Sequence, residues 1–241
     1  MIKMNILTPA VALLAIAMVC LYASCAKDYG EPTTKNFAIN GNYSSLEVNS
    51  CFEVTVSDQV TDVVITVGEK ALDKVKVEVK NGTLHIGFNW LTNYVGTATA
   101  IIPANTNLCE LDLSGGSKFT GDLTGSEVEL DLSGASIYYG NVNAEEVDVD
   151  LSGASEATLT GVCQTTMEIA LSGSSDLYAS GMSTQSVKGT MSGASSAYVT
   201  CCNLLEVALS GASDLHYGTS SPNCHPVINC TTSGASLVTP Q

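Results

Sequence analysis

The sequence predicts an all-β protein, a single-chain parallel β-solenoid (β-helix) with about 19–20 residues per coil. The first observation is a repeat of Ser-Gly-(Ala/Gly/Ser)-Ser at intervals of 19, 19, 20, 20, 18 and 23 residues. The second is an alternation of apolar and polar residues before each copy, and the third is that no stretch of the repeat region has a helical pattern. The copies begin at Ser114, Ser133, Ser152, Ser172, Ser192, Ser210 and Ser233.

The residues before each copy predict a strand with one buried face. Cys109, Leu111 and Leu113 lie five, three and one positions before Ser114, and acidic residues lie between them. A period of two places alternate side chains on opposite faces of a strand. A second short strand should follow each copy, with glycines such as Gly121 and Gly140 supplying the next turn. We expect right-handed coils, because parallel crossovers are almost always right-handed.

The repeated tetrapeptide itself is expected to be structural. Glycine permits the positive φ that a tight corner needs, and Ala or Ser beside it leaves room where neighbouring coils crowd together. Stacked Ser hydroxyls can bond the backbone groups that the strand ladder leaves unpaired. The repeated tetrapeptide is therefore expected to form the corners of the coils and not a binding or catalytic site.

The first residues indicate export. Residues 1–24 are expected to be a signal peptide, with Lys3, an apolar run over residues 6–21 and small residues before Cys25. This junction is typical of a bacterial lipoprotein, so we expect acylated Cys25, a tether over residues 25–35 and a lipid-anchored protein at the outer membrane or cell surface. An ordinary secretory peptide cut near Ser24 and a helical anchor are the alternatives. The sequence leaves the leaflet open.

Charge restricts the ligands that the protein can bind. The formal net charge is -15, with nine Lys and no Arg. Nucleic-acid binding depends on Arg and Lys for phosphate contacts and base readout, so it is not expected. Binding of an anionic polyuronate would likewise need cationic side chains, so such a polymer is not an expected ligand either.

Seven cysteines remain after Cys20 and Cys25, so at least one thiol should be free or bonded to another chain. Cys201 and Cys224 each lie nine residues before a Ser-Gly, at Ser210 and Ser233. They should therefore occupy the same corner of adjacent coils, which predicts a disulfide between them. Cys224 with Cys230 or with Cys202 is the competing pairing. No cysteine or histidine spacing matches a zinc site.

Residues 36–239 form one domain, with less regular N-terminal coils and regular repeats over residues 108–238. The segments Cys51–Val56, Asn81–Ile86, Ala100–Pro103 and Leu111–Ser117, followed by the later Leu-Ser-Gly-Ala-Ser copies, resemble the auto-transporter adhesin "head GIN" domain family of Bacteroidota lipoproteins and secreted proteins. The resemblance implies a β-helical cell-envelope protein with an adhesive or polymer-contacting role. The family has no catalytic motif to carry over.

One outward column is a candidate ligand surface. Six residues after the first Ser of each repeat lie aromatic side chains that could stack on sugar rings: Tyr139, Tyr178, Tyr198 and His216. The alternative is that Tyr simply suits half-exposed strands and shields its neighbours.

A second outward column is acidic. Asp112, Asp131 and Asp150 recur with the repeat and are weak candidates for calcium ligands. Like charges about 4.8 Å apart in water repel by only about 1 kcal/mol per pair, so no metal is required. No cofactor is expected.

The sequence therefore favours a non-enzymatic lipoprotein that serves as an adhesin or scaffold and binds surface glycans or other polymers. The alternative is a polysaccharide-binding or polysaccharide-degrading protein of the glycoside hydrolase type, with the carboxylates of Asp131 and Asp150 one coil apart. No catalytic residues are predicted. The oligomeric state is left open.

Overall fold

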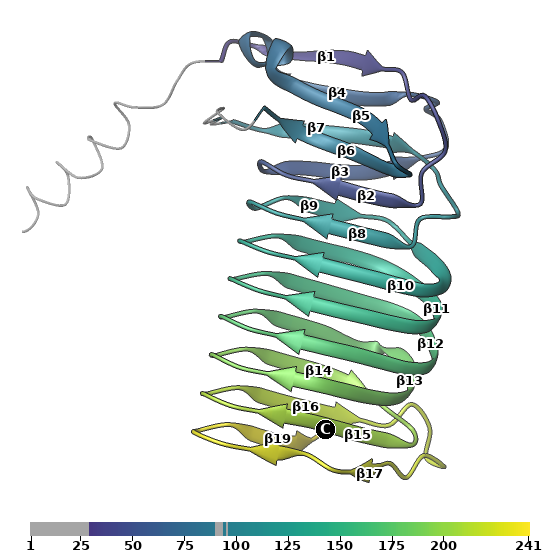
Figure 1. Ribbon diagram of the computed structural model, residues 1–241, viewed down its shortest axis with the longest axis vertical. Coiled ribbons are helices and arrows are strands. Elements are labelled where there is room, and N and C mark those ends of the chain that lie inside the picture. The colour runs from purple at the N-terminus through teal and green to yellow at the C-terminus, as the bar shows by residue number, and fades with distance from the viewer. Residues whose placement is uncertain (1–28, 90–93, 95) are drawn as a thin grey trace, which may run out of the picture.

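The computed structural model describes residues 29–89, 94 and 96–241. They form a rod of stacked coils with two facing layers of strands, the N-terminal coils at one end and the C-terminus at the other (Figure 1). The elements are β1 (Pro32–Phe37), β2 (Ser45–Val48), β3 (Phe52–Ser57), β4 (Val63–Gly68), the 3-10 helix η1 (Glu69–Lys74), β5 (Val75–Lys80), β6 (Thr83–Phe88), β7 (Ala98–Pro103), β8 (Glu110–Leu113), β9 (Lys118–Thr120), β10 (Leu123–Leu132), β11 (Ile137–Leu151), β12 (Glu156–Leu171), β13 (Asp176–Met191), β14 (Ser196–Thr200), β15 (Leu204–Leu209), β16 (Asp214–Gly218), β17 (Val227–Ile228), β18 (Thr231–Thr232) and β19 (Leu237–Pro240).

The regular coils confirm the predicted parallel β-solenoid. Val128 pairs with Val147, Val147 with Met167 and Met167 with Val187, so equivalent residues of successive repeats stack in register. Strands β11, β12 and β13 each run from one layer to the other without a tight turn. Each regular coil therefore has one sharp corner, at Ser-Gly, and one gentle bend.

The Ser-Gly corner has the predicted geometry. Gly153 has φ of 77°, and a Cβ on it would lie 2.5 Å from the carbonyl oxygen of Gly134 in the preceding coil. The hydroxyl of Ser155 donates to the carbonyl oxygen of Ser152 at 2.7 Å, which pairs a corner group that the ladder cannot reach. Equivalent bonds recur at Ser117, Ser136, Ser175, Ser195 and Ser213.

Gly140 was expected to supply a turn, but it lies within β11 and is needed for packing. Tyr138 is fully buried, stacks on Phe119 with ring centroids 5.9 Å apart, and donates its hydroxyl to the carbonyl oxygen of Gly121. A Cβ on Gly140 would clash with the carbonyl oxygen of Gly121 in the preceding coil and with that hydroxyl oxygen. Gly140 therefore makes room for a buried tyrosine in the core.

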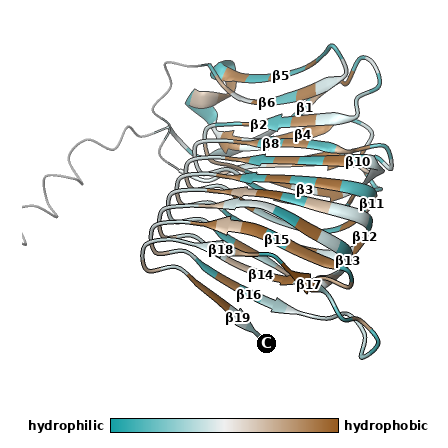
Figure 2. Cartoon of the chain, turned by 60° about the horizontal axis from the view of Figure 1, so that its bottom comes forward, coloured by the Kyte–Doolittle hydropathy of each residue, from teal (hydrophilic) through white to brown (hydrophobic). Residues whose placement is uncertain are grey.

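The core lies between the two layers, and its inward columns are those that the alternation predicts. Leu111, Leu130, Val149 and Ile169 are all at least 97% buried. Apolar and polar segments alternate along the stacked strands in Figure 2.

The N-terminal coils depart from sequence order. β2 pairs with β6 on one side and with β8 on the other, and β3 lies in the same way between β7 and β9. The coil formed by β6 and β7 thus lies outside the earlier coil formed by β2 and β3. Antiparallel pairs of β1 with β4, β4 with β7 and β5 with β6 close this end of the rod.

Part of the expected tether belongs to the folded domain. Residues 32–35 lie in β1, and the hydroxyl oxygens of Thr34 and Thr66 are 2.8 Å apart across the pairing with β4. The prediction of a tether up to residue 35 is wrong for these residues, because alternating contacts with β4 hold them. The predicted signal peptide, residues 1–24, and Cys25 lie outside the described residues. Within the described part of the chain, no helix is long and apolar enough to cross a membrane.

Candidate functional site

The two layers present different outer surfaces. We call the outer side of β3, β9, the first parts of β11, β12 and β13, and β14, β16 and β19 the aromatic face. The outer side of β2, β8, β10, the later parts of β11, β12 and β13, and β15 is the acidic face. Register pairing aligns each predicted column along one of these faces.

Three members of the aromatic column form a ladder of stacked rings. Tyr178 pairs with Tyr198 and Tyr198 with His216 in neighbouring strands. Their ring centroids are 5.3 Å and 4.6 Å apart, with interplanar angles of 16° and 9°. Because Tyr178 and His216 cover the two faces of Tyr198, this inner ring offers mainly its edge to a ligand. Only the outer faces of Tyr178 and His216, which lie beside Thr158 and Thr239, have no aromatic neighbour in the ladder.

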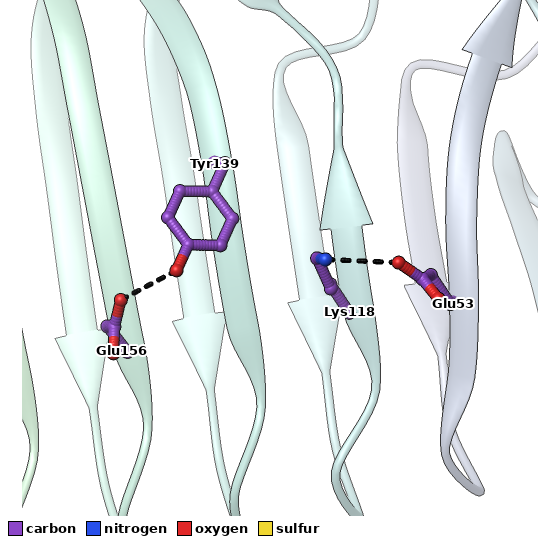
Figure 3. Close-up of polar contacts among 4 residues, drawn as sticks. All are labelled: Glu53, Lys118, Tyr139 and Glu156. Carbon is purple, nitrogen blue, oxygen red and sulfur yellow. Dashed lines mark hydrogen bonds and ion pairs between the residues drawn. The ribbon is translucent and has the colours of Figure 1, made fainter.

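Tyr139 has a different environment. Thr158 lies between it and Tyr178 in the column, and Thr120 lies on its other side, so no aromatic neighbour covers its ring. The side chain is 37% exposed. Figure 3 shows the ring broadside, with its hydroxyl directed toward Glu156 in the next coil. Tyr139 is thus the tyrosine of the column with no aromatic ring against either face, whereas Tyr178 is stacked on one face.

Polar groups surround this ring. The Tyr139 hydroxyl donates to Oε1 of Glu156 at 2.8 Å, and this hydrogen bond raises the pKa of Tyr139, so the hydroxyl keeps its proton. The ammonium of Lys118 lies 5.8 Å from the ring centroid and donates to Oε1 of Glu53 at 3.0 Å (Figure 3). An aromatic ring bordered by two carboxylates and one ammonium offers both an apolar surface and hydrogen-bonding groups.

Glu53, Lys118 and Glu156 were not singled out from the sequence. The pairing of β3 with β9 places Glu53 next to Lys118, although the two residues are 65 positions apart in the sequence. The repeat frame alone could have placed Glu156, which lies two residues before the column position of Thr158. Glu53 required knowledge of the coil order.

The acidic face carries the predicted carboxylate column. Asp112 pairs with Asp131 and Asp131 with Asp150, and Glu47 extends the column beyond Asp112. Partial burial, reinforced by neighbouring carboxylates, raises the pKa values of Asp112 and Asp131. Burial also raises the pKa of Glu129 in the adjacent column, with the same reinforcement.

The acidic columns end at His85, at Lys188 or at small residues. Nδ1 of His85 lies 2.8 Å from Oε2 of Glu47, and Lys188 follows Glu168 in the adjacent column. A shallow groove of about 390 Å³ lies where the acidic residues give way to Ala170, Gly189 and Thr190. Among the described residues, no three His, Cys, Asp or Glu side chains converge as a metal site would require.

The disulfide differs from the predicted one. Cys224 is bonded to Cys202 and not to Cys201, with a Cα–Cα distance of 4.5 Å. Cys201 is fully buried, so its thiol faces the core, whereas its neighbour Cys202 faces the other way and meets Cys224. The predicted pair Cys201–Cys224 is therefore wrong, and the competing pair Cys202–Cys224 is the one present. The other cysteines of the described residues, Cys51, Cys109, Cys163, Cys201 and Cys230, are free.

Several solved structures share this fold. A crystal structure of a "putative adhesin" from Bacteroides fragilis has a TM-score of 0.72 at 15% identity, covering 88% of this chain and 97% of that one. A "putative adhesin" from Parabacteroides distasonis has a TM-score of 0.64 at 20% identity, covering 90% and 99%. A "putative lipid binding protein" from the same species has a TM-score of 0.60 at 18% identity, covering 88% and 97%. These likenesses establish the fold.

No curated protein matches the sequence significantly. A family model described as "Putative auto-transporter adhesin, head GIN domain" matches residues 42–220, which include all but the last of the Ser-Gly corners. The match covers well over half of the chain and runs through both the N-terminal coils and the regular repeats. The chain belongs to the head GIN domain family of auto-transporter adhesins.

Proposed function

We propose that the protein is a non-enzymatic adhesin, held at the outer membrane or cell surface by a lipid on Cys25, that binds an uncharged polysaccharide. Family membership supports the adhesive role and an exported location. The lipid anchor is supported by the Ala23-Ser24-Cys25 junction. Metabolic labelling with an alkyne fatty acid tests the anchor, and labelling that survives Cys25→Ala would contradict it.

The open ring of Tyr139 is the observation that carries the glycan-binding proposal. The C–H face of a pyranose packs on an exposed aromatic ring, while the rim of the sugar carries hydroxyls that need hydrogen-bond partners. The carboxylate oxygens of Glu156 and Glu53 accept from such hydroxyls, and the ammonium of Lys118 donates to them. The net charge of -15 with no Arg favours an uncharged polymer over an anionic one.

Glycan-array binding by the full chain, compared with Tyr139→Ala, tests this site. We expect the best-bound glycan to lose at least about tenfold in affinity, since tenfold corresponds to about 1.4 kcal/mol and aromatic anchors commonly contribute more. The unfolding temperature should change little, because Tyr139 is exposed. Tyr198→Ala is the matched control, since Tyr178 and His216 cover both faces of its ring. Binding that survives Tyr139→Ala but not Tyr198→Ala would move the site to the ladder.

A polysaccharide-cleaving activity is the second candidate. The groove on the acidic face brings Asp131 and Asp150 to neighbouring strands, and burial with the charge of Asp150 raises the pKa of Asp131. A carboxyl group with a raised pKa beside a second carboxylate is the arrangement that glycoside hydrolases use. Release of reducing ends from a bound glycan, lost in Asp131→Asn, would favour this candidate over simple adhesion.

A further inference from the structure

The last coil leaves strand edges open. β19 pairs only with β16, and β17 and β18 pair only with β15, among the described strands. The N–H groups of Val227 and Asn229 donate to Asn203 and Leu205, so Ile228 between them directs its backbone groups away from the rod. By the same alternation Val238, next to Leu237 with its bond to Ser213, directs its backbone groups outward. Unpaired edges of this kind readily accept another strand.

The same coil exposes large apolar side chains and has none of the strongly charged residue types. Val227, Ile228 and Leu237 are three of the large apolar side chains that remain exposed, and Leu237 is 61% exposed. Residues 215–241 contain no Asp, Glu, Lys or Arg, although the whole chain has a net charge of -15. The opposite end of the rod is built differently, since β5 there carries Lys76, Glu78 and Lys80, with Lys76 and Glu78 paired at 2.7 Å. The rod therefore carries Lys and Glu side chains at one end, and at the other end exposed apolar side chains with no Asp, Glu, Lys or Arg.

We propose that the C-terminal coil binds the C-terminal coil of a second copy of this chain, end to end about a two-fold axis. A two-fold axis perpendicular to the rod brings the edge strands together antiparallel, so that their open N–H and C=O groups can pair. Pro240 has no N–H, which favours pairing centred on Val238. Contact between two copies at this end avoids charge repulsion. Side-by-side contact through the acidic faces would instead bring the carboxylate columns of the two copies against each other, where they would repel.

An end-to-end dimer would place the two N-terminal ends far apart, which matters for adhesion. The N-terminal coils and the C-terminus lie at opposite ends of the rod (Figure 1), so an end-to-end dimer directs its two N-termini away from each other. With each copy anchored near its N-terminus, two such copies connect two membranes. This step rests on the proposed function, because it requires the lipid anchor; the dimer itself does not.

Sedimentation equilibrium and negative-stain electron microscopy of the full chain in detergent test the dimer. We expect a dimer whose rods are twice the monomer length at unchanged width. Leu237→Asp, which places two like charges at the contact, should raise the dissociation constant at least about tenfold, while the unfolding temperature of the monomer, measured in dilute solution, should not fall. Val227→Asp on the other edge should do the same. Val162→Asp is the matched control, since Val162 is an apolar residue, 44% exposed, in the middle of the rod and should leave the dimer intact.

A monomer at all concentrations, or dimers of doubled width, would overturn the proposal. Phosphatidylcholine vesicles carrying the full chain then test the bridging step. They should cluster with one another, lose clustering with Leu237→Asp, and leave protein-free vesicles unclustered. Recruitment of protein-free vesicles would show lipid binding in place of self-recognition. Glycan binding lost in Tyr139→Ala with clustering retained would show that the two surfaces act separately, so either proposal can fail alone.

Discussion

Individual residues determine the shape of each coil at the Ser-Gly corner. Replacing Gly153 with Val should be strongly destabilising, because Gly153 has φ of 77° and any Cβ would lie 2.5 Å from the carbonyl oxygen of Gly134. Backbone strain and the displaced neighbouring coil together should cost at least about 3 kcal/mol, or a fall of about 6–12 °C in the unfolding temperature. Ala154 was expected to leave room between crowded coils but is exposed in the structure, so Ala154→Val should change stability by less than about 0.5 kcal/mol. Equal unfolding temperatures for the two variants would contradict this account of the corner.

The corner could be predicted from the sequence because it depends on a few adjacent residues that recur. The disulfide could not, since Cys201 and Cys202 are adjacent and only the direction of each side chain distinguishes them. The interval before the last repeat, 23 residues, also interrupts the frame used to align Cys224. Gly140 was predicted to supply a turn but lies within β11, where the carbonyl oxygen of Gly121 and the hydroxyl of the buried Tyr138 leave no room for a Cβ.

Whole strands, rather than single residues, produce the electrostatics of the acidic face. Burial and neighbouring carboxylates raise the pKa values of Asp112, Asp131 and Glu129 above those of an unfolded chain. The folded state therefore binds protons more tightly, and this contribution to stability grows as the pH falls from neutral toward about 4, where unfolded carboxyls titrate.

Thermal unfolding at pH 7 and pH 5 checks this expectation. The unfolding temperature of the native chain should rise on acidification, opposite to ordinary acid denaturation. Asp131→Asn should be more stable than the native chain at pH 7 and should show a smaller rise. Asp58→Asn, which removes a carboxylate outside the columns, should keep the full rise. If the unfolding temperature of the native chain is lower at pH 5 than at pH 7, repulsion among the carboxylates of the columns does not destabilise the folded state.

At the level of strands, the alternation predicted which side chains face inward, because period two follows from strand geometry alone. The order of the N-terminal coils was not predictable in this way. β2 and β3 lie between coils that come later in the sequence, so the ion pair of Glu53 with Lys118 beside Tyr139 depends on a long-range pairing. The aromatic column illustrates the same limit: its outward position follows from the repeat, but the stacking that covers Tyr198 and leaves Tyr139 open depends on Thr158 between them.

The whole molecule is a one-dimensional stack, in which each coil contacts only its neighbours. Its stability should therefore vary along the rod, since central coils are held from both sides and the last coil from one. Such an arrangement separates the roles of its parts. The middle of the rod can carry a rigid binding face, while the open end remains available for another chain.

Hydrogen exchange should reveal this gradient. In Leu237→Asp, which we expect to be monomeric, amides of β12 and β13 should exchange slowest and those of β17, β18 and β19 fastest, because the last coil can open without disturbing the others. In the native chain at concentrations that favour the dimer, protection should rise selectively at Ile228 and Val238, whose backbone groups face the open edge. Uniform protection along the rod of Leu237→Asp would show that the stack unfolds as a single cooperative unit. Unchanged exchange at Val238 in a native dimer would place the contact between copies away from the strand edges.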